Sequence, residues 1–167
     1  QLWLSIITLV AALVAVIWVA RDNQGITAAG AVTIDGPTLL IQGLVLMLSI
    51  LGLLAMSERL GGTNPDAFTQ AGVSVPGSAE EAEAVRLGGT TTEIYPLTLL
   101  SVGGMMLFPA SNDLLLMFIA LEVLSLPLYV LSGLARRRRL LSQEASLKYF
   151  LLGAFSSAFF LFGAVLL

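Results

Sequence analysis

The stretch from Met117 to Leu131 reads MFIALEVLSLPLYVL, and it decides how the rest of the chain is interpreted. Apart from Glu122, Ser125 and Pro127, its residues are hydrophobic. A helix at the surface of a soluble protein has a polar face, whereas a helix that is apolar all round is buried in a large core or in a membrane. The stretch therefore indicates a membrane helix, and its glutamate requires an explanation.

The composition of the whole chain is that of a membrane protein. Of its 167 residues, 57% are hydrophobic and 11% are charged, and the mean hydropathy is +0.93. A soluble domain is about half apolar and about a quarter charged. The net charge of -3 gives no reason to expect a nucleic-acid partner.

The sequence contains no Cys and no His. This excludes disulfides, Fe–S clusters held by thiolates and His-ligated haem from the chain. We therefore expect no cofactor here and any redox chemistry on other subunits. The chain begins at Gln1 and ends at Leu167 inside apolar sequence, so we also expect it to be an incomplete polypeptide.

Five apolar segments approach the length of a spanning helix, for which about 20 residues cover about 30 Å of hydrocarbon. The expected helices cover about 2–20, 37–56, 95–110 and 113–134, and a fifth runs from about 142 onward. Asp35 is placed to cap the second helix, and Asn112 or Ser111 to cap the fourth. The sequence predicts an all-α fold, a polytopic transmembrane helix bundle.

Three parts follow from this division: two helices in 1–57, a polar loop in 58–92 and three helices in 93–167. Ser78–Ala79–Glu80–Glu81 is a capping box, which predicts a short surface helix inside the loop. Arginines are concentrated in the connection 135–145. Because short loops rich in Lys and Arg face the cytoplasm, we expect the loops 58–92 and 135–145 on the cytoplasmic side.

Glu122 is expected about nine residues into its helix, or ~14 Å at ~1.5 Å per residue, near the mid-plane. A charge there costs on the order of 3 kcal/mol, and such groups usually face a bundle interior or a water-filled path. Ser125 lies at i+3 on the same face, and Pro127 removes the helical partner of the Val123 carbonyl. These groups predict a polar niche for ions or protons. The alternative is a neutral, structural glutamate beside a proline kink.

Lys148 is the second candidate, with Glu144 one turn before it at the favourable spacing for an ion pair. A lysine that reaches to the lipid headgroups, or a simple ion pair, explains the pattern equally well. Small residues near the end of the chain predict a tightly packed helix face: Gly153, Ala154, Ser156, Ser157 and Ala158. We interpret Gln42 and the pair Gly103–Gly104 as packing residues too.

Two stretches carry a resemblance to a known family. NDLLLMFIALEVLSLPLYVLSGL (112–134) is followed by a basic turn and then by QEASLKYFLLGAFSSAFFLFG (143–163). Together they closely resemble the antiporter-like membrane subunit N of bacterial respiratory complex I, the proton-translocating NADH:quinone oxidoreductase. The resemblance covers residues 95–167. The sister subunits L and M tend to have tryptophan before the glutamate, where this chain has Leu121.

The resemblance implies a proton-translocation path. Glu122 matches a glutamate on the family's fifth transmembrane helix, which pairs with a lysine on the seventh, and Lys148 matches a lysine on the sixth. It also implies NADH, FMN, Fe–S clusters and quinone on other subunits, and other complex I membrane subunits as partners. The expected location is the bacterial inner (plasma) membrane, within the lipid bilayer. The alternatives are a subunit of a cation/proton antiporter and a purely structural membrane scaffold subunit.

Overall fold

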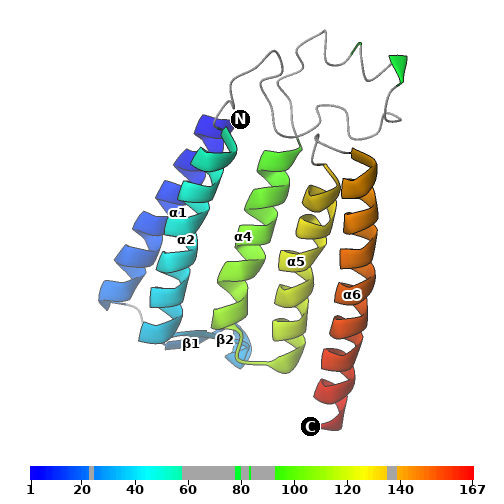
Figure 1. Ribbon diagram of the computed structural model, residues 1–167. Coiled ribbons are helices and arrows are strands. Elements are labelled where there is room, and N and C mark those ends of the chain that lie inside the picture. Colours follow the sequence, from blue (N-terminus) through cyan, green and yellow to red (C-terminus); the bar gives the residue numbers. More distant parts are fainter. Residues whose placement is uncertain (23–24, 58–77, 80–82, 84–92, 135–138) are drawn as a thin grey trace.

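The computed structural model describes residues 1–22, 25–57, 78–79, 83, 93–134 and 139–167, without the side chains of 21, 22, 57 and 139. Within these residues, five long helices confirm the expected all-α polytopic bundle (Figure 1). They are α1 (Leu2–Asp22), α2 (Gly36–Ser57), α4 (Ile94–Ala110), α5 (Leu114–Gly133) and α6 (Arg139–Leu166).

Four of these helices, α1, α2, α5 and α6, are long and apolar enough to cross a membrane. The fifth, α4, is a shorter apolar helix of 17 residues. Large hydrophobic side chains cover the outside of the bundle, and Trp3 and Trp18 at the two ends of α1 are 75% and 69% exposed. A soluble monomer rarely exposes so much contiguous apolar surface. Hydrocarbon is the medium in which this surface is favourable.

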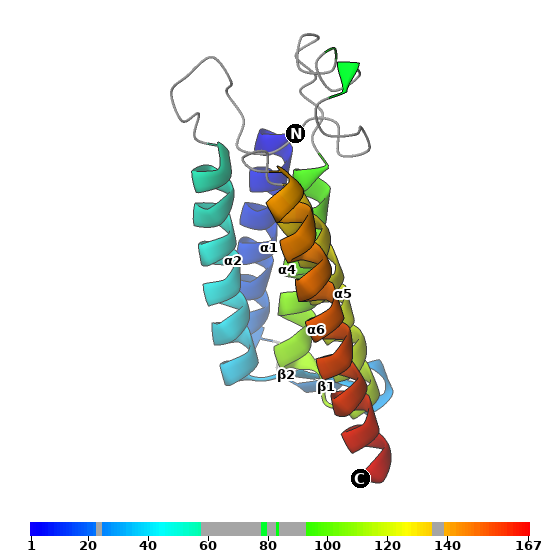
Figure 2. The same ribbon diagram turned by 45° about the vertical axis from the view of Figure 1, so that its right-hand side comes forward.

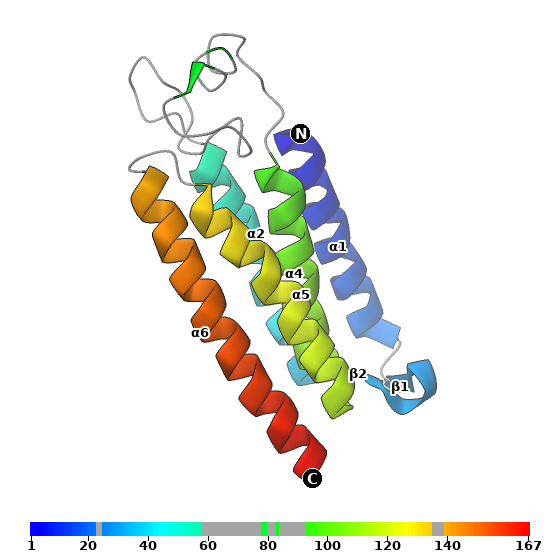
Figure 3. The ribbon, with the colours of Figure 1, turned by 90° about the vertical axis from the view of Figure 1, so that its right-hand side faces the viewer.

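The helices pack in chain order. Each of α1, α2, α4 and α5 contacts the next helix along the chain, and α1 also contacts α4. The core of the first three helices is formed by Leu9, Leu46, Leu53 and Val102. Among the described elements, α6 contacts α5 alone. Figures 1 and 3 show it at the edge of the bundle, and in Figure 2 it lies in front of α5. One side of α5 and most of α6 therefore have no covering helix in the described chain.

The start predicted for α2 is confirmed, whereas the starts of α5 and α6 differ from the prediction. The Thr38 backbone N–H donates to Asp35 Oδ1 at 2.9 Å, which confirms Asp35 as the cap of α2. The prediction for α5 was wrong, because Asp113 is its cap and accepts from the Leu115 N–H at 3.4 Å. The last helix starts at Arg139 rather than near 142, since no Gly or Pro interrupts these residues and Arg and Leu are good helix formers.

Ser111 and Asn112 are not caps because they bind other groups. The Ser111 hydroxyl donates to the Leu107 carbonyl at the end of α4, at 2.9 Å. The Asn112 side-chain amide donates to Gly30 O at 2.9 Å, and its backbone N–H donates to Ala31 O at 2.8 Å. Ser111 thus binds α4, and Asn112 binds the connection between α1 and α2. Neither side chain caps α5.

That connection is a small β-hairpin, which the sequence did not reveal. It consists of β1 (Gly25–Thr27), the 3-10 turn η1 (Ala28–Gly30) and β2 (Val32–Ile34), with β1 and β2 antiparallel. Ala28, Ala29 and Gly30 all have positive φ, at 52°, 56° and 95°. Only glycine adopts this region at little cost, so the contacts with Asn112 hold a strained turn in place.

The short helix predicted inside the loop 58–92 lies almost wholly outside the described residues. Of that stretch, Ala79 and Glu83 are helical in the structure. The arginines Arg136, Arg137 and Arg138, together with Arg59 and Arg86, also lie outside the described residues. The sidedness of the loops stays a prediction.

Candidate functional site

Glu122 is the ninth of the 20 residues of α5, so it lies close to the middle of a helix of membrane-crossing length. Its side chain is partly buried. Among the described residues, the carboxylate has neither a hydrogen-bond partner nor an ion-pair partner. An unpaired carboxylate at this depth is costly, which makes Glu122 the first candidate of the site.

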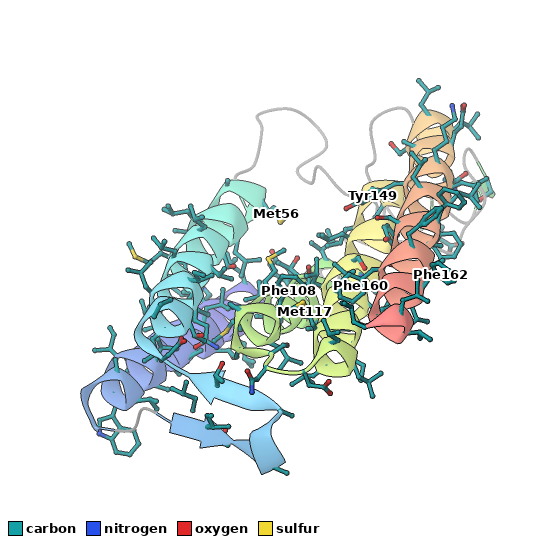
Figure 4. All side chains as sticks on the ribbon, turned by 90° about the horizontal axis from the view of Figure 1, so that it is seen from below. Met56, Phe108, Met117, Tyr149, Phe160 and Phe162 are labelled. Carbon is teal, nitrogen blue, oxygen red and sulfur yellow. The ribbon has the colours of Figure 1, made fainter. Side chains whose placement is uncertain are left out.

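Aromatic contacts between α5 and α6 show which residues of α6 lie opposite Glu122. Phe118 stacks on Phe160, with ring centroids 6.3 Å apart and planes 15° from parallel. Tyr129 meets Tyr149 edge-on, with centroids 4.6 Å apart and planes at 86°. Since α5 and α6 are antiparallel, these two contacts place Glu122 opposite residues 156–157. In Figure 4, Phe160 lies between α5 and α6, whereas Phe162 lies on the far side of α6.

Ser125 and Pro127 are both buried on α5 near Glu122. The Ser125 hydroxyl donates to the Leu121 carbonyl at 2.6 Å, with a longer contact of 3.4 Å to the Glu122 carbonyl. It therefore serves the backbone of its own helix and not the carboxylate. α5 continues through Pro127 as one helix up to Gly133. Ser125 and Pro127 thus lie near Glu122 without a direct bond to its carboxylate, and the polar niche stays a prediction.

Lys148 forms the expected pair with Glu144, with Nζ 2.5 Å from Oε1. The two side chains are 68% and 57% exposed, so the pair lies on a face of α6 that no described helix covers. Lys148 is eight residues away from the level of Glu122, or ~12 Å along the helix axis. The structure does not bring the two candidates together.

Two of the five small residues near the end of the chain pack against α5. Gly153 lies against the Tyr129 ring, where an added Cβ would meet Tyr129 Cε1 at 2.9 Å. Ser157 is 8% exposed. Ala154, Ser156 and Ala158 are exposed, so the prediction of a packed face was right for Gly153 and Ser157 and wrong for these three.

Packing also accounts for the polar and small residues of α2 and α4. The Gln42 side-chain amide donates to the Met106 carbonyl at 2.9 Å and thereby joins α2 to α4. A Cβ on Gly104 would meet Leu124 Cα at 2.8 Å, whereas Gly103 has nothing within 4 Å. The packing interpretation is confirmed for Gln42 and Gly104.

Tyr129 is the site residue that the sequence did not single out. Its side chain is 7% exposed and lies against three aromatic or small residues of α6. The signal was present, because Tyr129 follows Glu122 by seven residues, which is the same face of a helix two turns on. Among the described residues, no cluster of three Asp, Glu, His or Cys side chains is placed to hold a metal ion.

Known proteins are similar to this chain in the region of these helices. Residues 111–167 match the family NADH:quinone oxidoreductase/Mrp antiporter, TM. Subunit N of the NADH-quinone oxidoreductase of Rhodococcus opacus is 57% identical over 95% of this chain and 33% of its own length. The subunit N of Mycobacterium tuberculosis is 56% identical over 93% of this chain and 33% of its own length. The chain thus spans about a third of the curated relatives it matches.

A solved structure agrees with these relatives. A chain of respiratory complex I from Thermus thermophilus, determined with bound aureothin, superposes with a TM-score of 0.63 at 31% sequence identity. The match covers 97% of this chain and 29% of the other. The resemblance found in the sequence is therefore confirmed. The chain is similar over nearly its whole length to about a third of subunit N of NADH-quinone oxidoreductase, and residues 111–167 match the NADH:quinone oxidoreductase/Mrp antiporter family.

Proposed function

We propose that this chain is part of a membrane-arm subunit of a proton-pumping NADH:quinone oxidoreductase, and that Glu122 binds and releases the translocated proton. The observation that carries the proposal is the carboxylate itself, partly buried at the middle of α5 and without a partner among the described residues. The similarity to subunit N of several bacteria supports it.

The proposed chemistry uses the two charge states of Glu122. A cation that approaches the carboxylate favours its charged form, so the proton leaves. When the cation withdraws, the apolar surroundings favour the neutral form and a proton binds. The cation is a lysine of the complete subunit beyond this chain. Lys148 is a further group of the path, held on the other face of α6 by its pair with Glu144.

The remaining parts of the proposal concern the assembly. The chain contributes no redox centre, and NADH, FMN, the Fe–S clusters and quinone bind to other subunits. Its partners are the other membrane subunits of the complex, in the bacterial inner membrane. The loops 58–92 and 135–145 face the cytoplasm, following the distribution of arginines.

The proposal is tested by Glu122→Gln in the complete subunit, within the assembled complex. Glutamine keeps the shape and removes the titratable proton. Glu93→Gln is the matched control, because Glu93 is exposed before α4 and its side chain makes no cap hydrogen bond. We expect fewer protons pumped per NADH in Glu122→Gln and an unchanged ratio in Glu93→Gln. Full pumping in both variants would leave Glu122 as a structural carboxylate in a scaffold subunit.

A second function is favoured by one observation. The family that matches residues 111–167 includes Mrp antiporters. A cation/proton antiporter subunit would exchange ions across the membrane without NADH oxidation. Sodium-dependent proton movement in vesicles that lack NADH, abolished by Glu122→Gln, would select this function over the first.

A further inference from the structure

The Tyr129 hydroxyl is a polar group between α5 and α6 that the proposed path has not used. The side chain is 7% exposed, and its ring lies edge-on against Tyr149 at 4.6 Å and Phe150 at 5.7 Å. Among the described residues, the hydroxyl has no hydrogen-bond partner. In the described part of the chain, the one enclosed side-chain oxygen without a partner is Thr98 Oγ1. The Tyr129 oxygen is therefore open to solvent and can bind water.

The hydroxyl is directed toward the level of Glu122. Side chains on a helix lean toward its N-terminus, and in α5 that is the direction from Tyr129 to Glu122. The end of the ring lies on the bare backbone of Gly153, where any larger side chain would collide with it. Gly153 is one helical turn from Ser157, which is at the level of Glu122.

Ser157 continues this line of hydroxyls. It is 8% exposed and faces α5, and its hydroxyl has no hydrogen-bond partner among the described residues. Other helix serines donate to a backbone carbonyl: Ser49 to Val45 O of its own helix at 2.6 Å, and Ser101 to Leu124 O of α5 at 2.8 Å. Tyr129 and Ser157 are thus two unpaired hydroxyls along one seam between α5 and α6.

A groove reaches the other side of Tyr129. It has a volume of about 340 Å³ and lies between the last turns of α5 and the first turns of α6. Its lining consists of Tyr129, Val130, Gly133, Gln143, Ser146, Leu147 and Phe150. Tyr129 therefore stands between this groove, at the end of the helices, and Glu122 in their middle.

Building on the proposed function, we propose that the hydroxyls of Tyr129 and Ser157 relay protons, with water molecules, between this groove and Glu122. In each step the hydroxyl oxygen accepts the excess proton of a protonated water, which is left as neutral water, while the hydroxyl's own proton passes to the next acceptor. A hydroxyl is donor and acceptor at once, so every group ends with as many protons as before. The proton is delivered to, or taken from, the Glu122 carboxylate.

Tyr129→Phe tests the relay, because it removes one oxygen and keeps the ring that packs on α6. Tyr149→Phe is the matched control, since Tyr149 belongs to the same aromatic contact but is 43% exposed. Both are made in the complete subunit, with assembly followed on a native gel. We expect a loss of protons pumped per NADH in Tyr129→Phe alone. If Tyr129 only packs, phenylalanine replaces it without loss, and the relay is overturned.

Ser157→Ala is a second test, with the exposed Ser156→Ala as its control. It keeps the inference testable if Tyr129→Phe fails to assemble. We expect fewer protons pumped per NADH in Ser157→Ala and the wild-type ratio in Ser156→Ala. Normal pumping in Ser157→Ala and Tyr129→Phe, with reduced pumping in Glu122→Gln, would reject the relay and leave the proposed function intact. Normal pumping in Glu122→Gln would reject the proposed function itself.

Discussion

Two adjacent glycines of α4 have different surroundings, and this difference gives a prediction at the scale of single residues. A methyl group on Gly104 would collide with the backbone of Leu124, whereas one on Gly103 would meet nothing within 4 Å. We expect Gly104→Ala to destabilise the α4–α5 contact by about 1–3 kcal/mol, the usual cost of overpacking. Gly103→Ala should be neutral or stabilising by up to about 1 kcal/mol, since alanine favours helix.

Thermal unfolding of the complete subunit in detergent measures this difference. Gly104→Ala should unfold at a lower temperature than the wild type, and Gly103→Ala should not. Equal unfolding temperatures for the two variants would contradict the close approach of α4 and α5 at Leu124.

Asp35 gives a prediction about pH. The hydrogen bonds that Asp35 accepts from Thr38 lower the pKa of its carboxyl below the usual 3.8. A carboxyl with a lowered folded pKa stabilises the protein above its unfolded pKa, and this stabilisation is lost as the pH falls through the folded value. Asn also caps helices but does not titrate in this range.

The unfolding temperatures of the wild type and Asp35→Asn should therefore be compared across pH. The difference between them should stay constant above about pH 5 and change, to the disadvantage of the wild type, below about pH 4. A difference that is the same at every pH would show that Asp35 does not act as a charged cap.

At the scale of elements, the hairpin is joined to the loop before α5 by Asn112. Its side-chain amide donates to Gly30 O at 2.9 Å, and its backbone bond to Ala31 O persists in any variant. We expect Asn112→Ala to lose about 0.5–1.5 kcal/mol locally, the net value of one hydrogen bond. Amide hydrogen exchange of residues 25–34 should become faster while that of α2 is unchanged. Unchanged exchange in the hairpin would show that the amide contributes nothing to its docking.

The elements also show what the sequence can predict. Runs of apolar residues bounded by Asp35, Pro37 and Pro96 located the helices, because length and hydrophobicity decide whether a segment spans a membrane. The hairpin stayed hidden because Ala28 and Ala29 adopt positive φ, which alanine rarely does without tertiary contacts. The cap of α5 was predicted wrongly because three polar residues, Ser111, Asn112 and Asp113, stand before the helix. The fold shows that the first two bind other groups.

The site shows the same limit. Glu122 is recognisable as an outlier in an apolar helix, and Glu144 and Lys148 by their spacing of four. The distance between Glu122 and the Glu144–Lys148 pair depends on how far α5 and α6 are shifted along each other. The contact between Tyr129 and Gly153 sets this shift, and no local pattern in either helix contains it.

At the scale of the whole molecule, the packing level of α5 against α6 can be tested by cross-linking. A Cβ built on Gly133 lies 3.2 Å from Ser146 Cβ, close to the roughly 3.5–4.5 Å of a disulfide. Because the chain has no cysteine of its own, Gly133→Cys with Ser146→Cys should cross-link readily under mild oxidation. Glu122→Cys with Lys148→Cys should not, since these residues are separated by ~12 Å along the axis. Linkage of the second pair would overturn this packing.

The outer face of α6 shows how this chain fits a larger assembly. α6 contacts only α5 among the described elements, and its exposed side chains include Phe155, Phe159 and Phe162. The chain spans about a third of the relatives it matches. The exposed Glu144–Lys148 pair lies nearer the start of the same uncovered helix, where the proposed path would continue toward other membrane helices.

The most direct test of the account is the number of protons pumped per NADH oxidised in membrane vesicles that carry Glu122→Gln in an assembled complex. This ratio should fall below the wild-type value in Glu122→Gln and stay at the wild-type value in Glu93→Gln. A ratio equal to the wild type in Glu122→Gln would show that the carboxylate at the middle of α5 carries no translocated proton.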